Sequence, residues 1–197
     1  METTLLLALM GYAFVNTVTP GPNNLMLIAS GANFGFRRTI PHMVGITVGI
    51  CVMIFLVGFG LVGLFDRYPV THSVLRVVSI VYMAWLTWKI ATAAAPGQTD
   101  AAGRPFTALQ AALFQWVNPK AWAMAFPAFT AFAPDRSVQE VLIVTAAFGL
   151  VSFPSISVWT WMGGEIRRFL GTATRLRTFN WTMAALLVAS MVPLLRA

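Results

Sequence analysis

Long apolar stretches dominate the chain and determine which elements we expect. Residues 3–36, 39–65, 141–164 and 178–195 contain no Asp, Glu, Lys or Arg. A helix needs about 20 mostly apolar residues to span a bilayer, so each stretch predicts a transmembrane helix. Two further spans are predicted at 69–91, with Arg76 and Lys89 near its ends, and at 107–133, with Lys120 inside it. The apolar runs are continuous rather than alternating, which favours helices over a β-barrel.

Composition agrees with this pattern and excludes a disordered chain, a coiled coil and an ordinary cytosolic enzyme. Hydrophobic residues make up 58% of the 197 residues and charged residues only 10%, whereas soluble domains carry about 25% charged residues. We therefore predict an all-α integral membrane protein with six transmembrane helices, forming one domain over residues 1–197. The net charge of +7 is spread between the apolar runs, which indicates a lipid bilayer as the partner and no nucleic acid.

Few residues suit chemistry that depends on a metal or a cofactor. Cys51 is the only cysteine, so the chain has no internal disulfide and no thiolate cluster. His42 and His72 have no His, Cys or carboxylate partner within sequence reach, so we predict no metal site. The chain also lacks a phosphate-binding loop ending in Gly-Lys-Ser or Gly-Lys-Thr. We expect no cofactor and no catalytic residues, hence a protein that is not an enzyme.

The charges of the loops predict how the helices are oriented. The first, third and fifth loops together contain eight Lys and Arg residues, and the opposite side contains four. Cytoplasmic loops of membrane proteins carry an excess of Lys and Arg. We therefore expect the odd-numbered loops, including the linker at about 94–106, in the cytoplasm and both termini outside.

The two halves of the chain carry similar interruptions. The first predicted helix contains Thr-Pro-Gly-Pro-Asn-Asn at 19–24, the fourth contains Asn-Pro-Lys at 118–120, and Pro22 and Pro119 lie 97 residues apart. Proline lacks an N–H and clashes with the preceding turn, so each motif should break its helix. Each half (about 1–93 and 107–197) holds three helices, so the second half enters from the opposite face. We predict two inverted three-helix repeats with helices one and four broken, an arrangement typical of transporter sites.

The two breaks supply groups that suit a solute carboxylate. A half-helix that resumes after a break presents free N–H groups and a positive dipole end. Asn side chains add donors and acceptors, and Lys120 adds a positive charge or a titratable amine. No acidic residue lies deep in a predicted span, which favours a small neutral amino acid over lysine or arginine. The predicted substrate-binding residues are Thr19, Pro20, Gly21, Pro22, Asn23, Asn24, Asn118, Pro119 and Lys120.

These motifs resemble those of a known family. Residues 19–24, the glycine-rich second helix and residues 114–120 (Phe-Gln-Trp-Val-Asn-Pro-Lys) resemble the lysine exporter superfamily (LysE/RhtB type) of small bacterial amino-acid exporters. The Asn23-Asn24 pair and residues 88–92 (Trp-Lys-Ile-Ala-Thr) look most similar to its cysteine/O-acetylserine exporter branch.

The resemblance implies a specific kind of transport. It implies proton-coupled, alternating-access export of small amino acids or derivatives, of cysteine/O-acetylserine or homoserine/threonine type, across the bacterial inner membrane. Many relatives carry Asp where this chain has Asn23, so a proton or cation role at that position is not carried over.

Several alternatives stay open at this point. A basic amino-acid exporter of the same family would share the motifs, and a lipid-handling or assembly protein would share the composition and the broken helices. An intramembrane enzyme would need a nucleophile and a base that converge, and the two histidines lie near predicted interfaces. Gly45 and Gly49 form a GxxxG motif, which packs helices either within a chain or in a homodimer.

Overall fold

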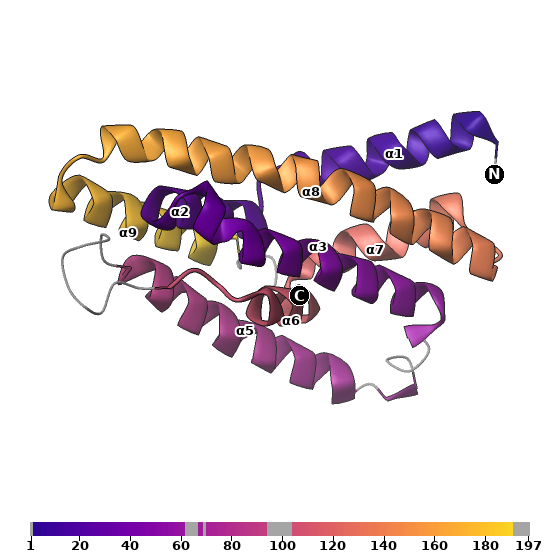
Figure 1. Ribbon diagram of the computed structural model, residues 1–197. Coiled ribbons are helices and arrows are strands. Elements are labelled where there is room, and N and C mark those ends of the chain that lie inside the picture. Colours follow the sequence, from indigo (N-terminus) through magenta and orange to yellow (C-terminus); the bar gives the residue numbers. More distant parts are fainter. Residues whose placement is uncertain (1, 62–66, 69, 94–103, 191–197) are drawn as a thin grey trace.

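The described part of the chain is built from helices that run along one elongated bundle (Figure 1). The computed structural model describes residues 2–61, 67–68, 70–93 and 104–190; most of the predicted linker at 94–106, Asp66, and the side chains of His72 and Arg76 lie outside this description. The prediction of an all-helical chain is confirmed for the described residues. Within them the helices are α1 (Thr3–Val18), α2 (Pro22–Phe34), α3 (Phe36–Gly58), α5 (Val70–Ala91), α6 (Ala108–Val117), α7 (Pro119–Phe132), α8 (Val138–Phe169) and α9 (Ala173–Ala189).

Length and apolar composition suit some of these helices to a membrane. Among the described helices α3, with 23 residues, and α8, with 32, are each long and apolar enough to cross one. The pair α1 and α2 also qualifies when it is taken as one span, bent by 57° at its break. Helices α6, α7 and α9 are shorter, with 10, 14 and 17 residues, and α5 has 22, of which Val77–Ala91 count as an apolar helix. A helical membrane protein is therefore supported, and six spans stay a prediction.

The helix breaks lie where the proline motifs place them. Helix α1 ends at Val18 and α2 begins at Pro22, while α6 ends at Val117 and α7 begins at Pro119. Both prolines occupy the first turn of the helix that they begin, where a missing N–H loses no intrahelical bond. Pro22 and Pro119 thus mark one break in each half of the chain, whereas Pro41, Pro127 and Pro154 lie inside helices.

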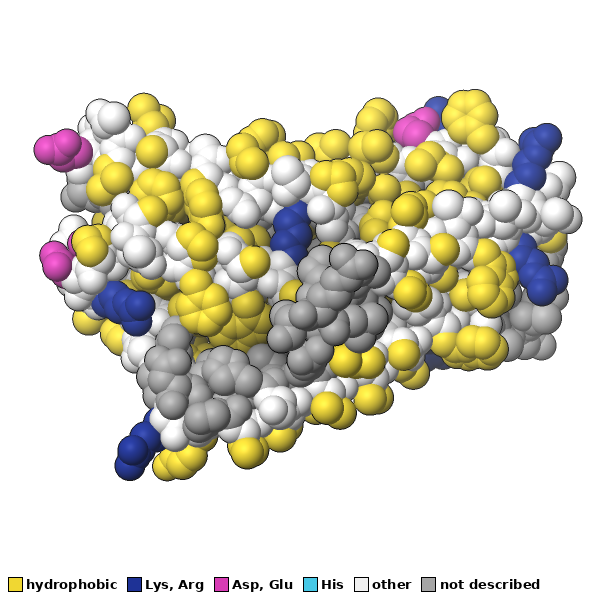
Figure 2. All heavy atoms as spheres, turned by 180° about the vertical axis from the view of Figure 1, so that it is seen from behind, with side chains coloured by type: hydrophobic (Ala, Val, Ile, Leu, Met, Phe, Trp, Pro, Cys, Tyr) yellow, Lys and Arg dark blue, Asp and Glu magenta, His cyan; other side chains and the backbone are white. Residues whose placement is uncertain are grey.

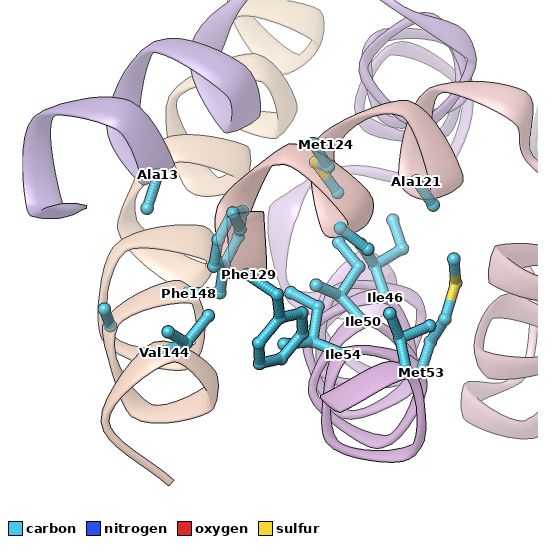
Figure 3. Close-up of a cluster of buried hydrophobic side chains, with 14 of the residues drawn as sticks. Ala13, Ile46, Ile50, Met53, Ile54, Ala121, Met124, Phe129, Val144 and Phe148 are labelled. Carbon is cyan, nitrogen blue, oxygen red and sulfur yellow. The ribbon is translucent and has the colours of Figure 1, made fainter. Parts of the chain in front are cut away.

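Helices from both halves share one hydrophobic interior. In Figure 3 the side chains of Ile46, Ile50 and Ile54 on α3 lie close to Phe129 of α7 and Phe148 of α8, and all five are buried. Lipid is as apolar as these side chains, so close packing rather than escape from water holds such helices together. Helices α3 and α8 thus form the centre around which the two breaks are arranged.

Glycines allow α2 and α8 to approach closely. A Cβ atom on Gly31 of α2 would collide with the backbone carbonyl of Thr160 on α8, and a Cβ on Gly163 of α8 would collide with that of Ile28 on α2. The contact is therefore reciprocal and leaves room for hydrogen alone at both positions. Small residues at such crossings are typical of helix pairs in membranes.

The GxxxG motif of α3 is used inside the chain. A Cβ on Gly45 would collide with the backbone of Ala108, and one on Gly49 would lie 2.6 Å from the Cα of Ala112. Both partners belong to α6, in the second half of the chain. Of the two roles expected for this motif, the structure shows packing within one chain.

Charged side chains gather toward the ends of the bundle. On the face in Figure 2 hydrophobic side chains cover the flank, and most Lys, Arg, Asp and Glu side chains lie near the two ends, with basic atoms also visible midway. Polar caps begin several helices at these ends, for example the reciprocal bonds of Ser137 with Glu140 at the start of α8. An apolar flank between two charged ends suits a protein embedded in a bilayer.

Candidate functional site

A small cavity lies where the two helix breaks meet. Its volume is about 20 Å³, which is room for roughly one water molecule and too little for an amino acid. In this state the space is therefore too small for the solute, although Thr19 and Pro20 beside it are exposed. We call it the central cavity; its polar lining comes from Asn16, Thr17, Gly21, Asn23, Asn24, Asn118, Lys120 and Ser152.

A pair of side-chain amides joins the two halves beside the central cavity. Asn23 of α2 donates from its Nδ2 to Oε1 of Gln115 on α6 at 2.8 Å, and Gln115 donates back from its Nε2 to Oδ1 of Asn23 at 3.2 Å. Gln115 is fully buried and also donates to the carbonyl of Ala111. These bonds satisfy two amides that lipid cannot solvate, and they connect the first break to the helix preceding the second.

The break between α1 and α2 frees backbone carbonyls, and side chains bond to them. Asn24 donates from its Nδ2 to the carbonyls of Thr17, at 3.1 Å, and Thr19, at 2.7 Å. The indole N–H of Trp159, on α8, donates to the carbonyl of Val18 at 3.1 Å. Buried carbonyls need such partners, so Asn24 and Trp159 stabilise the unwound backbone.

Lys120 closes the same end of α1 from the second half of the chain. Its ammonium donates to the carbonyl of Thr19, to the Thr19 hydroxyl at 2.9 Å and to the carbonyl of Pro20 at 3.3 Å. A cation at the C-terminal end of a helix is favoured by the helix dipole. A Cβ on Gly21 would lie 2.6 Å from Cδ of Lys120, so the glycine makes room for the lysine stem.

The two half-helices that begin at the breaks differ in how they are capped. At α7 the side chain of Asn118 accepts from the backbone N–H of Lys120 at 3.1 Å. At α2 the cap position is Gly21, which has no side chain, and no side-chain bond caps this helix. The start of α2 therefore offers an uncapped positive helix end at the central cavity, where an anionic group would be stabilised.

Helix α8 contributes polar groups that the sequence analysis did not single out. Ser152 is 0% exposed, lines the central cavity, and its hydroxyl has no hydrogen-bond partner. Three residues later, the Ser155 hydroxyl accepts from the Thr17 hydroxyl at 3.1 Å. The available signal was two serines on either side of Pro154 in an otherwise apolar run, which says nothing about the direction in which they face.

The structure brings most of the predicted site residues together. Gly21, Asn23, Asn24, Asn118 and Lys120 line the central cavity. Thr19 and Pro20 contact it through Lys120, whereas Pro22 and Pro119 begin helices and do not line it. Among the described residues of the lining none is acidic, so the site as described offers no counter-charge to a cationic solute.

Comparison with known proteins gives consistent matches. The profile of a family described as LysE type translocator matches residues 14–196. The chain is 28% identical to a cysteine/O-acetylserine efflux protein of Klebsiella pneumoniae, over 95% of both chains. It is 26% identical to one of Escherichia coli K12, over 95% of this chain and 96% of the relative. A leucine efflux protein of Enterobacter sp. strain 638 is 26% identical over 83% of this chain and 82% of its own length. No solved structure matches.

Proposed function

Because the chain belongs to the family of LysE type translocators, we propose that it is a secondary exporter of small neutral amino acids or their derivatives. The observation that carries this proposal is the central cavity, where two broken helices meet around amide, hydroxyl and ammonium groups. Broken helices that meet in this way are typical of transporter binding sites.

The groups around the central cavity suit the carboxylate of an amino acid. The uncapped start of α2 and the ammonium of Lys120 both stabilise negative charge. A cationic side chain such as that of lysine would have no carboxylate to meet among the described lining residues and would lie near the like charge of Lys120. Relatives named for the efflux of cysteine, O-acetylserine and leucine support a neutral solute.

We propose alternating access between two inverted three-helix repeats as the mechanism. In this scheme α1–α2 and α6–α7 are spans one and four, α3 and α8 are spans two and five, and α5 and α9 are spans three and six. Some neighbour relations support it, because α1 packs on α8 as α6 packs on α3. The two repeats are not packed alike, since α2 contacts α8 much more extensively than α7 contacts α3. Solute binding then requires the breaks to separate, since the central cavity is too small for an amino acid.

The cellular setting is part of the same proposal. We propose a multi-pass protein of the bacterial inner membrane with both termini in the periplasm and with export coupled to the proton gradient. A homodimer also stays a prediction. It would have to use a face other than the GxxxG motif, which is occupied by α6 within the chain.

Counterflow in proteoliposomes tests the function directly. Vesicles containing the purified protein are preloaded with cysteine, O-acetylserine, leucine, serine, threonine, homoserine, lysine or arginine, and uptake of the matching labelled solute is recorded. We expect accelerated exchange of one or more neutral solutes. Because counterflow needs no coupling ion, its outcome does not depend on the proposed use of protons.

Each other outcome of the counterflow experiment would contradict one part of the proposal. Exchange of lysine or arginine alone would keep the exporter and overturn the argument from charge. Absence of exchange with all eight solutes, by protein shown to be folded, would favour the lipid-handling alternative. Asn118→Ala should remove exchange while the protein still inserts, and normal exchange by this variant would contradict a site at the breaks.

A further inference from the structure

A second and larger cavity lies away from the helix breaks. Its volume is about 160 Å³, and its lining comes from α2, from the end of α5 and from the residues that precede α6. We call it the Lys89 cavity. It lies toward the end of the bundle where α2 and α5 finish (Figure 1). Cavities that enclose drug-sized ligands start at about 300 Å³, so this one suits a smaller solute.

Two cations and an apolar wall give the Lys89 cavity its chemistry. Lys89 and Arg104 both line it, and neither pairs with a carboxylate among the described residues. The Lys89 ammonium lies 4.4 Å from the ring centre of Phe106 and 5.3 Å from that of Trp85. Aromatic faces attract a cation without neutralising it, so the ammonium stays available to an anion.

The wall opposite these cations is fixed by a buried amide pair. Asn33, which lines the Lys89 cavity, donates to Oδ1 of Asn180 at 2.8 Å and accepts from Nδ2 of Asn180 at 3.2 Å. Asn180 also donates to the carbonyl of Ala93 at 2.9 Å. These bonds join α2, α9 and the end of α5, so the cavity has a defined shape.

One face of α2 connects the two cavities. Asn23 lines the central cavity, and Met26, Ser30 and Asn33 line the Lys89 cavity. Their spacings of three, four and three residues place all four on one side of a helix. At 1.5 Å per residue this face is roughly 15 Å long. The same helix surface thus runs from the basic cavity to the helix breaks.

We propose that the Lys89 cavity is a second binding site, at the cytoplasmic side, for the carboxylate of the small solute that the central cavity transports. Lys89 and Arg104 bind the carboxylate, and Met26, Ala29 and Ile90 contact the apolar part of the solute. The site rests on the export function proposed above. It places the solute at one end of the α2 face before it reaches the breaks.

Protection of an introduced cysteine tests this site. Thr92 lines the Lys89 cavity and is exposed, so Thr92→Cys in a Cys51→Ala background gives one reactive thiol there. The probes are O-acetylserine and leucine, and the readout is the rate of alkylation by N-ethylmaleimide. At about ten times the dissociation constant, alkylation should slow roughly tenfold, because only the empty site reacts. The Lys89→Gln/Arg104→Gln pair should lose this protection.

Matched variants separate this site from the central one. Protection should persist with Asn118→Ala, although that variant no longer exchanges solute. It should also persist with Arg177→Gln, which removes an exposed charge outside the cavity. A cysteine at Thr174, outside the cavity, should not be protected. Lys89→Arg keeps a cation at this position and should retain part of the protection. That result would show that the Lys89→Gln/Arg104→Gln pair loses protection because it loses charge and not because it is misfolded.

The outcomes distinguish failure of this site from failure of the proposed function. Solute exchange without protection of Thr92→Cys would overturn the second site and leave the exporter intact. No exchange by the wild-type protein would overturn the proposed function itself. A third outcome is protection of Thr92→Cys that requires phosphatidylglycerol in the bilayer and occurs without solute. That result would assign Lys89 and Arg104 to a lipid phosphate and would overturn the solute site.

Discussion

At the scale of single residues, Lys120 is central because it belongs to both halves of the chain at once. Its backbone begins α7, while its ammonium bonds three oxygen atoms of Thr19 and Pro20 at the end of α1. Removal of the ammonium would leave the Thr19 carbonyl with Asn24 as its remaining side-chain donor and the Pro20 carbonyl without a side-chain donor. The residue therefore contributes to the shape of the site as well as to its charge.

We predict that Lys120→Met lowers both stability and transport. The loss of stability should be about 0.5–1.5 kcal/mol, the net range of a typical hydrogen bond, because the bonded residues Thr19 and Pro20 are exposed. Thermal unfolding in detergent and counterflow of a neutral solute measure the two effects. Lys120→Arg, which keeps a cation and several donors, should retain more of both, and equal loss in the two variants would contradict a role for the ammonium.

Ser152 and Ser155 allow a matched comparison on one helix. The Ser152 hydroxyl has no partner, whereas that of Ser155 bonds Thr17. We expect Ser152→Ala to leave the unfolding temperature unchanged or slightly higher and to raise the half-saturation concentration for exchange. Ser155→Ala should instead lower the unfolding temperature. An unaltered half-saturation concentration in Ser152→Ala would show that the solute does not meet this hydroxyl.

At the scale of helices, close crossings as well as hydrogen bonds hold the bundle together. Gly31 and Gly163 each face a backbone carbonyl of the other helix, so α2 and α8 touch along their main chains. Helix α2 also carries the face that joins the two cavities. Its distance from α8 therefore affects both the central site and the path toward it.

Adjacent glycines on α8 make this crossing testable. A Cβ on Gly163 would collide with the carbonyl of Ile28, whereas a Cβ on Gly164 would have no atom within 4 Å. We expect Gly163→Ala to destabilise the protein by about 1–3 kcal/mol, the usual range for overpacking, and Gly164→Ala to have little effect. Unfolding temperatures of the two purified variants provide the measurement; similar values would contradict the close approach.

At the scale of the whole molecule, the distribution of charge predicts the orientation in the membrane. Four arginines flank the loop between α8 and α9, two at the end of α8 and two at the start of α9. The described residues around the start of α1 contain no arginine. Positive loops stay in the cytoplasm. The molecule should therefore insert with the start of α1 in the periplasm.

Labelling of intact cells tests this orientation. In a Cys51→Ala background, Glu2→Cys should react with a membrane-impermeant maleimide in intact cells. Arg177→Cys, at the arginine-rich end, should react only after the cells are permeabilised. The reverse pattern would invert the proposed topology, and with it the assignment of the Lys89 cavity to the cytoplasmic side.

Sequence reasoning worked where the chemistry is local. The breaks were predicted from the motifs that contain Pro22 and Pro119, whereas single prolines such as Pro41 and Pro154 lie inside unbroken helices. Gln115 and Ser152 were missed because their importance depends on which helix faces which, and a lone Gln or Ser in an apolar run does not show this. The Lys89 cavity likewise needs α2, α5 and the residues before α6 in one place.

The bonds of Lys120 to the end of α1 have a kinetic consequence. For the breaks to separate, the ammonium must leave Thr19 and Pro20. A bound solute offers its carboxylate as a replacement acceptor, while the empty carrier has none. Reorientation of the loaded protein should therefore be faster than return of the empty one. Exchange of solute for solute would then outpace net efflux, because the bound solute itself lowers the barrier to reorientation.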